Sequence, residues 1–431
     1  MSSFVGPKSD AKDFWLRLDN AAKIFPSGTN KKRTLVFRFT AEICKPVNFG
    51  ILQEATRLTA TRYPYFTMHL RRGFFWYWLD SENPELTIVQ DTGLPCQAFH
   101  FSGKEMPLCR ILTRTDQISA EFYHVLADGY GAMEFFKTLL TAYAELSGYA
   151  LPDKGFSHYS ESSHEEETED AYNHYFDPKL PAPLQLSRAY HIPYPVLRSE
   201  LRIIPLEVNS ELVRQKAKSL GISLTEYLAS IYLWSLQEIY NRTRHIRRLV
   251  RRPVIRVQVP VNLRSLFPTR SLRNFSLFVT PEIDMRLGQY TFEEITRIVH
   301  YYMQHQTDPK LMRKRIYKNV RNEKSLFIKL VPLVIKNRIL NYYFKRSGMA
   351  LYSGLITNLG RIELKGDMEI LVQRLRLIPP PPDLSKVGIG AITWNQKLVL
   401  SFVNSTPSNL LEKIFLDYLV QDGIPVKIIK P

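Results

Sequence analysis

The sequence predicts a mixed α/β protein of two half-domains, and three observations support this. The chain has 431 residues, more than the size at which one hydrophobic core stops growing, so two units are expected. Segments with alternating apolar side chains are interleaved with segments of helical period, which indicates both strands and helices. An acidic stretch separates two series of such elements. We therefore predict half-domains over residues 1–185 and 186–431.

The first half-domain is predicted to begin with a strand, a helix and a hairpin. Residues 34–43 form the strand. Residues 47–63 form the helix, because Phe49, Leu52 and Ala55 recur at helical spacing. An Arg-Arg-Gly turn predicts the hairpin within residues 66–79, and residues 107–126 supply two further strands.

A motif of the form His-x-x-x-Asp-Gly closes this series of strands. Residues 118–124 alternate between apolar and polar side chains, which predicts a half-buried strand with His124 on its apolar face. Asp128 and Gly129 follow in a turn. Residues 133–146 then show the spacing of an amphipathic helix that ends near Gly148.

Histidine is the side chain whose unperturbed pKa lies near neutrality. An inward-facing His124 just before a sharp turn therefore favours a role in proton transfer. The structural alternative is a core histidine with a satisfied hydrogen bond, followed by an ordinary turn. The switch from strand to turn to amphipathic helix favours the catalytic interpretation.

The second half-domain is predicted to alternate strands and helices as well. Asn209 caps a helix that stops at Gly221, and Ser223 to Glu226 start a second, nearly all-apolar helix in the manner of a capping box. The predicted strands and the closing helix of this half cover residues 197–208, 254–261, 276–283 and 397–402, and residues 410–419.

Two charged segments are expected to lie outside the core. Residues 153–180 include a run in which acidic side chains dominate, which predicts a flexible loop. Residues 310–346 interleave lysine and arginine with apolar side chains around Pro332, which predicts a basic helical segment. This segment is either a helical hairpin packed on the core with solvated charges or a surface for peripheral membrane association.

The net charge of +17 calls for an anionic partner such as a nucleic acid, an anionic membrane or a phosphate-bearing small molecule. No nucleic-acid-binding module is apparent, so nucleic acid is not expected. Cys44, Cys96 and Cys109 lack metal-ligand spacing, so we expect free thiols and no metal. Without an apolar leader or membrane span, a cytoplasmic location is expected.

Beyond the central motif, several short segments resemble the chloramphenicol acetyltransferase-like superfamily, which includes condensation domains and alcohol acetyltransferase-like enzymes. Their shared signature is His-His-x-x-x-Asp-Gly, and the first position here is Tyr123. The other similar segments occur in the family's order: Trp15–Ala22, Val259–Arg264, Leu272–Ser276, Thr357–Gly360, Lys397–Phe402 and Leu410–Leu419.

The resemblance implies two chloramphenicol acetyltransferase-like half-domains, each a mixed β-sheet flanked by helices, with an active-site channel between them. It implies transfer of an acyl group from acyl-CoA or a carrier-bound thioester to an alcohol or amine, most simply O-acylation. The partners would be the small-molecule donor and acceptor, or a carrier protein as donor. No permanently bound cofactor is expected.

The resemblance also assigns the site, His124, Asp128 and Gly129. His124 would be the general base in a direct transfer without a covalent acyl-enzyme, and Asp128 would form a structural salt bridge with Arg264. Thr357, Asn358 and Asn274 are the candidates for steadying the oxyanion or the substrate. Because Tyr123 replaces the first histidine, a catalytically inactive relative that binds a hydrophobic ligand or a protein partner is the alternative.

Overall fold

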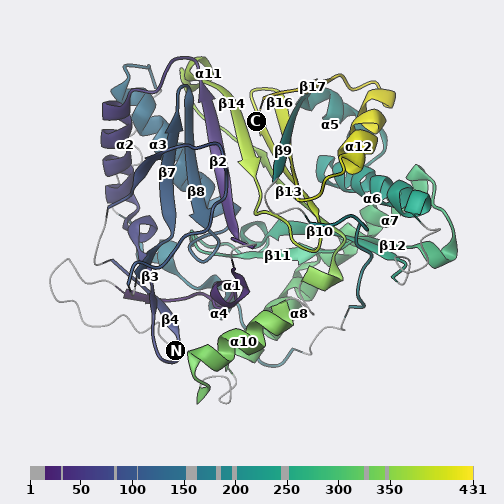
Figure 1. The fold of residues 1–431 in the computed structure, drawn as a ribbon, viewed down its shortest axis with the longest axis horizontal. Coiled ribbons are helices and arrows are strands. Elements are labelled where there is room, and N and C mark those ends of the chain that lie inside the picture. Colours follow the sequence, from purple (N-terminus) through teal and green to yellow (C-terminus); the bar gives the residue numbers. More distant parts are fainter. Residues whose placement is uncertain are drawn as a thin grey trace.

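The computed structural model describes residues 15–30, 33–81, 85–103, 105–151, 163–180, 186–196, 201–243, 252–324, 330–344 and 349–430. Two sheet-centred halves lie side by side, with a small sheet and two basic helices below them in the view of Figure 1. The predicted mixed α/β class is confirmed.

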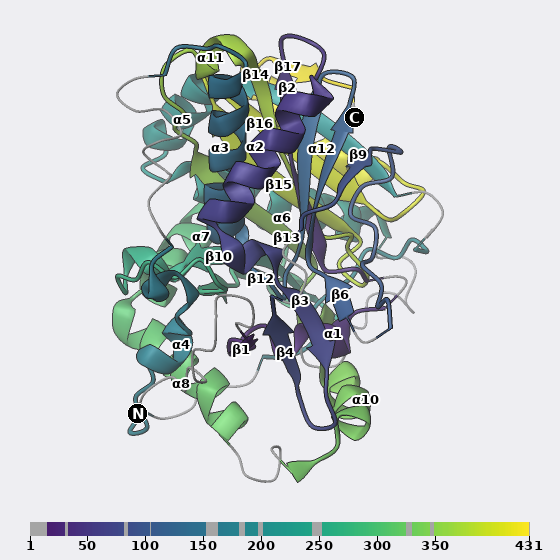
Figure 2. The same cartoon turned by 90° about the vertical axis from the view of Figure 1, so that its left-hand side faces the viewer.

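A five-stranded sheet forms the core of the first half. Its strands run in the order β14-β2-β8-β7-β5, and all pairs are antiparallel except β5 with β7. Helices α2 and α3 pack together and cover one face of this sheet (Figures 1 and 2). The elements are β2 (Val36–Ile43), β5 (Ile88–Gln90), β7 (Cys109–Arg114), β8 (Gln117–Tyr123), β14 (Val372–Ile378), α2 (Phe49–Arg62) and α3 (Gly129–Leu146).

The prediction that β8 is half-buried is wrong, because both of its faces are covered. Ser119 and Glu121, on the face expected to meet solvent, are as buried as their apolar neighbours. Glu121 is neutralised by Arg38, whose Nε lies 2.7 Å from the carboxylate, and by Arg110. The loop after β5 closes over it, and the backbone N of Cys96 donates to Glu121 Oε1 at 2.5 Å. Paired charges therefore replace water on this face.

A second, smaller sheet and one short helix lie beneath the first half. The sheet has the order β1-β4-β3-β6, and β3 and β4 form the predicted hairpin. Its strands, and the short helix α1 beside them, are β1 (Trp15–Arg17), β3 (His69–Arg72), β4 (Tyr77–Asp80), β6 (Glu105–Pro107) and α1 (Phe25–Gly28).

An eight-stranded sheet with helices against it forms the second half. Its order is β11-β10-β13-β15-β16-β9-β17, with β12 paired to β10. The strands are β9 (Arg202–Asn209), β10 (Val254–Asn262), β11 (Ser276–Val279), β12 (Glu282–Asp284), β13 (Gly354–Arg361), β15 (Val387–Trp394), β16 (Lys397–Asn404) and β17 (Val426–Ile428). Its helices are α5 (Ser210–Ser219), α6 (Leu224–Thr243), α7 (Phe292–Gln306) and α12 (Leu410–Gln421).

Local signals in this half place the helices well. Asn209 caps α5, and Gly221 follows that helix with a φ of 70°. The capping box before α6 is present, since Ser223 N donates to Glu226 Oε2 at 2.6 Å and Glu226 N to Ser223 Oγ at 3.2 Å. The strand expected over residues 276–283 is instead divided into β11 and β12, because Pro281 between them has no N–H to donate.

One strand crosses between the halves. β14 follows α11 (Met368–Leu371) late in the chain, yet it pairs with β2 in the sheet of the first half, with Leu377 opposite Phe39. Sheet membership therefore does not follow a single division of the chain, and the boundary at residues 185 and 186 stays a prediction.

The acidic segment is structured where it is described. Residues 163–180 contain a 3₁₀ turn (Glu165–Thr168) and α4 (Ala171–His174), so a flexible loop is wrong for this part, and residues 152–162 lie outside the description. Glu167 is buried against Arg62, whose Nη2 lies 2.7 Å away, and the carbonyl of Glu167 accepts from the backbone N of Leu272. Partners far along the chain order the segment, which composition does not reveal.

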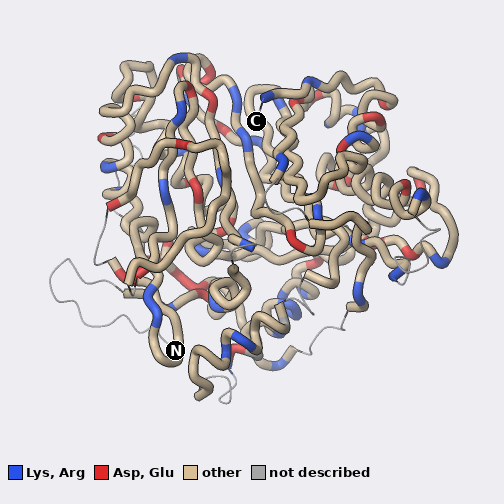
Figure 3. The backbone as a smooth tube through the Cα atoms, viewed as in Figure 1, with Lys and Arg blue, Asp and Glu red and all other residues tan. Residues whose placement is uncertain are grey.

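The basic segment forms α8 (Pro309–Lys324) and α10 (Leu333–Tyr343), with Pro332 at the N-cap of α10 and residues 325–329 outside the description. Lysine and arginine positions occur along both helices and are more numerous on α8 (Figure 3). Met312, Ile316 and Val320 bury one side of α8, as the packed-hairpin interpretation expects. Among the described helices, none combines the length and hydropathy needed to cross a bilayer.

Candidate active site

The turn between β8 and α3 presents His124. Its backbone N donates to the carbonyl of Leu35 at 3.0 Å, which extends the β8–β2 pairing by one residue. The turn is then closed by Leu126 N, which donates to the Tyr123 carbonyl at 2.8 Å, and by the Tyr65 hydroxyl, which donates to the Leu126 carbonyl. These bonds fix the backbone on both sides of the imidazole.

The His124 ring lies among aromatic side chains at the edge of the core. Ring centroids of Phe37 and Phe25 are 4.6 and 5.5 Å from it. Burial lowers the pKa of His124 below its usual 6.5, and the carboxylate of Asp128 opposes that shift. Nδ1 is buried without a hydrogen-bond partner, while the residue as a whole is partly exposed. The exposed part of the residue is therefore not Nδ1, and the lowered pKa favours a neutral ring at pH 7.

Asp128 anchors the turn, and its contacts suit an acceptor of structural hydrogen bonds and not a base in the reaction. It is the N-cap of α3, and its Oδ1 accepts from Gly131 N at 3.1 Å. Its Oδ2 accepts from Arg264 Nη1 and from Phe275 N, both at 2.8 Å. Three donors from two halves of the chain converge on one buried carboxylate, which holds the turn against the second half.

Arg264, the partner expected for Asp128, is itself fixed on every side. Its Nε donates to the Ser271 carbonyl at 2.9 Å, and its Nη2 to the Arg273 carbonyl at 2.5 Å. Its guanidinium also stacks on Tyr130, 4.6 Å from the ring centroid. A planar, five-donor group suits this position, where a lysine could not reach all of these acceptors.

Asn274 has a different position from the one expected of an oxyanion donor. Its Nδ2 donates to the His124 carbonyl at 2.9 Å and to Asp19 Oδ2 at 3.1 Å, so both amide hydrogens are in use. Asn274 therefore holds the backbone of His124 and is not free to steady a substrate in this arrangement.

Asp19 is a site residue that the motif analysis missed. It is fully buried, accepts from Ala22 N at 2.7 Å, and lies 3.6 Å from Arg273 Nε. Burial raises the pKa of this carboxyl to about 6, and the charge of Arg273 opposes the rise. An aspartate between Leu18 and Ala22 in the segment that resembles the family is the signal that could have found it.

The two remaining oxyanion candidates lie on β13 and face opposite ways. Asn358 is held within its own half, since its Nδ2 donates to Thr225 Oγ1 at 3.0 Å and its Oδ1 accepts from Gly360 N at 2.9 Å. The pairing of β13 with β15 shifts register between Asn358 and Arg361, after Thr357. Thr357 is partly exposed, and its hydroxyl makes no hydrogen bond within the described residues.

Leu359 brings β13 against the turn that follows His124. A Cβ placed on Gly129 would lie 2.9 Å from Leu359 Cδ2, so the two halves touch there. Gly129 thus provides close approach, and its φ is not positive. Gly131, which the motif does not include, is more tightly confined, because a Cβ there would lie 1.9 Å from the Leu272 carbonyl oxygen.

Tyr123, which replaces the family's first histidine, has a structural role. It is buried, and its hydroxyl is 2.6 Å from Thr29 Oγ1, which in turn donates to the carbonyl of Phe25. It therefore fixes α1, the helix whose Phe25 ring lies against His124.

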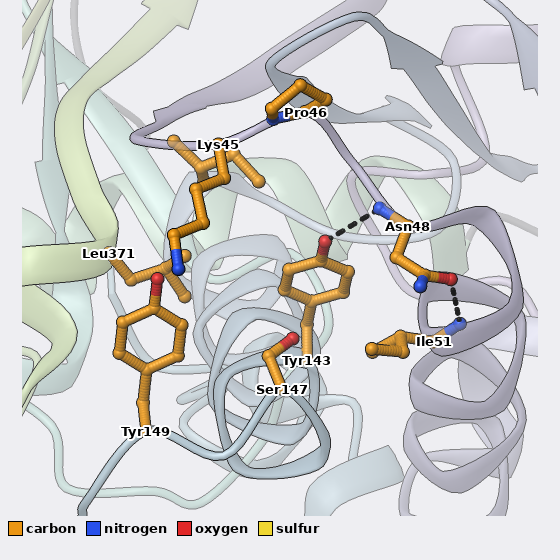
Figure 4. A pocket seen from close by; sticks show the side chains of 9 residues that line it. Lys45, Pro46, Asn48, Ile51, Tyr143, Ser147, Tyr149 and Leu371 are labelled. Atoms are coloured by element: carbon orange, nitrogen blue, oxygen red, sulfur yellow. Dashed lines mark hydrogen bonds between the residues drawn. The ribbon is translucent and has the colours of Figure 1, made fainter.

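A separate hollow of about 180 Å³ lies at the other end of β2 (Figure 4). Lys45, Tyr143 and Tyr149 are among its lining residues. Since β2 rises about 3.3 Å per residue, the hollow is roughly 20 Å from His124. Within the described residues no cluster of three or more His, Cys, Asp or Glu could hold a metal ion. The arginine-rich stretch 244–251 lies outside the description.

No family model matches the chain, and no curated protein is similar to it. Solved structures are similar over nearly the whole chain. Trichothecene 15-O-acetyltransferase from Fusarium sporotrichioides has 10% identity and a TM-score of 0.59, covering 96% of both chains. Wax ester synthase/diacylglycerol acyltransferase from Marinobacter aquaeolei VT8 has 11% identity and a TM-score of 0.53, covering 95% of this chain and 100% of its own.

A starter condensation domain of rhizomide synthetase, in complex with C8-CoA and Leu-SNAC, has 13% identity and a TM-score of 0.57, covering 95% of this chain and 94% of its own. The structural neighbours are thus acyltransferases and condensation domains. The chain has the chloramphenicol acetyltransferase-like fold, as the sequence motifs predicted.

Proposed function

We propose that this protein, which has the chloramphenicol acetyltransferase-like fold, is an acyltransferase that moves an acyl group from a thioester to a hydroxyl or amine. One observation carries the proposal. His124, a partly exposed residue whose imidazole has a lowered pKa, lies on the turn that meets β13 of the second half through Gly129 and Leu359, and β13 also carries Thr357. A neutral imidazole is the form that can accept a proton.

His124 would act as general base through the accessible part of its ring. It takes the proton of the acceptor as the acceptor's oxygen or nitrogen bonds to the thioester carbonyl carbon. The carbonyl oxygen becomes an oxyanion, which the Thr357 hydroxyl would stabilise. When the carbon–sulfur bond breaks, the sulfur leaves with the electron pair and the imidazolium returns the proton to it. No covalent acyl-enzyme is needed, and no Gly-x-Ser-x-Gly elbow occurs in the sequence.

The donor would be acyl-CoA or an acyl group on a carrier protein, and the acceptor an alcohol. A net charge of +17 suits a donor with phosphate groups. Two of the neighbours are named for transfer to oxygen, an O-acetyltransferase and a wax ester synthase, and a third was solved with C8-CoA. O-acylation is therefore the preferred reaction over N-acylation.

The test is turnover of a panel of acyl-CoAs of increasing length with alcohol and amine acceptors. Products and free CoA are measured by mass spectrometry, because the exposed Cys44 would react with thiol reagents. We expect His124→Gln to lower kcat by about 10²–10⁴-fold, the usual contribution of a general base. The exposed His305→Gln serves as the matched control and should keep full activity.

Thr357→Val should lower kcat more than it raises KM, because an oxyanion donor acts in the transition state. Binding of acyl-CoA without product formation under any of these conditions would instead support the inactive, ligand-binding relative. Equal activity of wild type and His124→Gln would overturn the assignment of His124.

A further inference from the structure

Apolar side chains are exposed on two neighbouring elements at the base of the molecule. They occupy the turn between β3 and β4, the residue Leu330 just before α10, and the outer side of α10, and each is between 41% and 74% exposed. We call this set the basal face; its members are Phe74, Phe75, Leu330, Val334, Ile335 and Ile339. On α10 itself, Val334, Ile335 and Ile339 form one apolar stripe on the exposed side, and Leu330 lies just before the helix begins.

Specific bonds hold the two elements of the basal face together. Leu333 N donates to the Phe74 carbonyl at 2.8 Å, and Lys336 Nζ donates to the Phe75 carbonyl at 3.0 Å. The same ammonium lies 3.3 Å from the centre of the Trp76 ring. Figures 1 and 2 both place the hairpin and α10 at the same end of the molecule. The tip and the helix therefore present their apolar side chains from one fixed surface.

The inner side of α10 is fully occupied, so the helix has a definite orientation. Leu333 and Lys336 are buried. Asn337 accepts from Ser27 Oγ at 2.7 Å and donates to the Tyr77 hydroxyl at 2.9 Å. A helix anchored by polar bonds on one side and apolar on the side facing solvent differs from an ordinary surface helix, whose outer side is polar.

The segment of the chain that contains α10 carries charge of one sign only. From residue 324 to residue 362 the chain has lysines and arginines but no aspartate or glutamate. Arg72, beside the hairpin tip, and Arg338, within the apolar stripe, are exposed. In the sheet that carries the hairpin, Asp80 and Glu105 are ion-paired with Arg71. Apolar and aromatic side chains beside exposed cations are the pattern of a surface that lies in the interface of an anionic membrane.

We propose that the basal face docks on the surface of a membrane that contains anionic lipids. The apolar side chains would enter the boundary between headgroups and acyl chains, and the flanking cations would attract the lipid charge. The apolar stripe alone would fit a protein groove as well as a lipid surface. The positive charge of the same segment favours the lipid surface. The proposal does not depend on the acyl-transfer reaction, and its test uses no substrate.

The test is co-sedimentation of the full chain with phosphatidylcholine vesicles and with vesicles in which about a third of the lipid is phosphatidylserine. We expect binding to the anionic vesicles that weakens strongly between 0.1 and 0.5 M NaCl, as surface electrostatics require (Debye length falling from about 10 Å toward 4 Å). Val334→Asp/Ile339→Asp should reduce the bound fraction at least tenfold. Leu287→Asp/Val420→Asp, at exposed apolar positions elsewhere, should bind as wild type does.

Equal far-UV spectra and melting temperatures would show that the aspartate variants are folded. Val334→Ser/Ile339→Ser, a milder change, should weaken binding in the same direction. Absence of binding to phosphatidylserine vesicles, or binding that the basal variants leave unchanged, would overturn the proposal. So would vesicle-independent self-association that Val334→Asp/Ile339→Asp abolishes, because a second copy of the chain would then be the occupant.

Discussion

Two buried carboxylates flank His124, and they are paired very differently. Asp128 receives three hydrogen bonds of 2.8 to 3.1 Å, one of them from the guanidinium of Arg264. Asp19 has its arginine at 3.6 Å, and burial raises the pKa of its carboxyl to about 6. The close pairing of Asp128 suits a permanent anchor. The looser pairing of Asp19 leaves a carboxyl with a pKa of about 6, so its charge changes between mildly acidic and neutral pH.

The difference also reflects where the partners lie in the chain. Asp128 caps the helix that follows it, so part of its role is visible in a nine-residue window. Asp19 reaches His124 only through Asn274, whose amide joins the two. Long-range contacts therefore bury Asp19 without a close charged partner. This distinguishes Asp19 from Asp128, which is held by close hydrogen bonds.

The largest effect is expected from Asp128→Asn. The amide would place a donor against the N–H groups of Arg264 and Phe275, and it would leave the guanidinium buried without a counter-charge. Removing one partner of a buried pair typically costs about 3–5 kcal/mol. Urea unfolding should show a loss of that size, together with reduced turnover because His124 is no longer held. Unchanged stability with lost turnover would point to a chemical role for Asp128 instead.

Asp19→Asn should change the pH dependence of stability. Because the folded-state pKa of about 6 lies above the ordinary 3.8, the folded protein binds more protons than the unfolded chain between these values. The free energy of unfolding therefore receives a contribution from Asp19 that is present below about pH 4 and is lost as pH rises through 6. Asparagine removes this loss, on the order of 2–3 kcal/mol at 1.36 kcal/mol per pKa unit.

The measurement is urea unfolding of wild type and Asp19→Asn at pH 4 and pH 7. The variant should gain stability relative to wild type on going from pH 4 to pH 7. The exposed Asp417→Asn on α12 is the matched control and should show no such relative gain. Parallel profiles for wild type and Asp19→Asn would remove the distinction between the two carboxylates.

Substituting the two glycines that follow Asp128 should lower stability by smaller amounts, and the two losses should differ in size. Gly131→Ala would force a methyl group against the Leu272 backbone, which must move, at about 1–3 kcal/mol. Gly129→Ala meets only the mobile end of Leu359 and should cost less than about 1 kcal/mol. Thermal unfolding of both variants distinguishes them. A more damaging Gly129→Ala would mean that the family's glycine is the stricter requirement.

The smallest expected change is in the pH–rate profile. With His124 as base, kcat/KM should fall on the acid side with an apparent pKa below 6.5, because burial lowers the pKa of the ring. Removing the Asp128 charge should move this limb to lower pH, since that charge opposes the shift. Asp19→Asn should leave the limb in place. If the acid limb moved in Asp19→Asn but not in the Asp128 variant, the titrating group would be Asp19 and not His124.

Short-range patterns in the sequence predicted the elements that carry His124 and the helices of the second half. The period of residues 118–124 placed the strand, Gly148 marked the end of α3, and Ser223 with Glu226 marked the start of α6. Each of these signals works within a few residues, where backbone geometry and capping bonds are set by neighbours along the chain.

The sequence by itself therefore determined the class of fold, the strand, turn and helix that display the imidazole, and the excess of positive charge. Folding in three dimensions determined the rest. It buried Glu121 between arginines, ordered residues 163–180 through Arg62, carried β14 into the first sheet, and engaged Asn274 with Asp19. These outcomes depend on partners tens to hundreds of residues apart, whose meeting is governed by packing and charge neutralisation and leaves no local periodicity to detect.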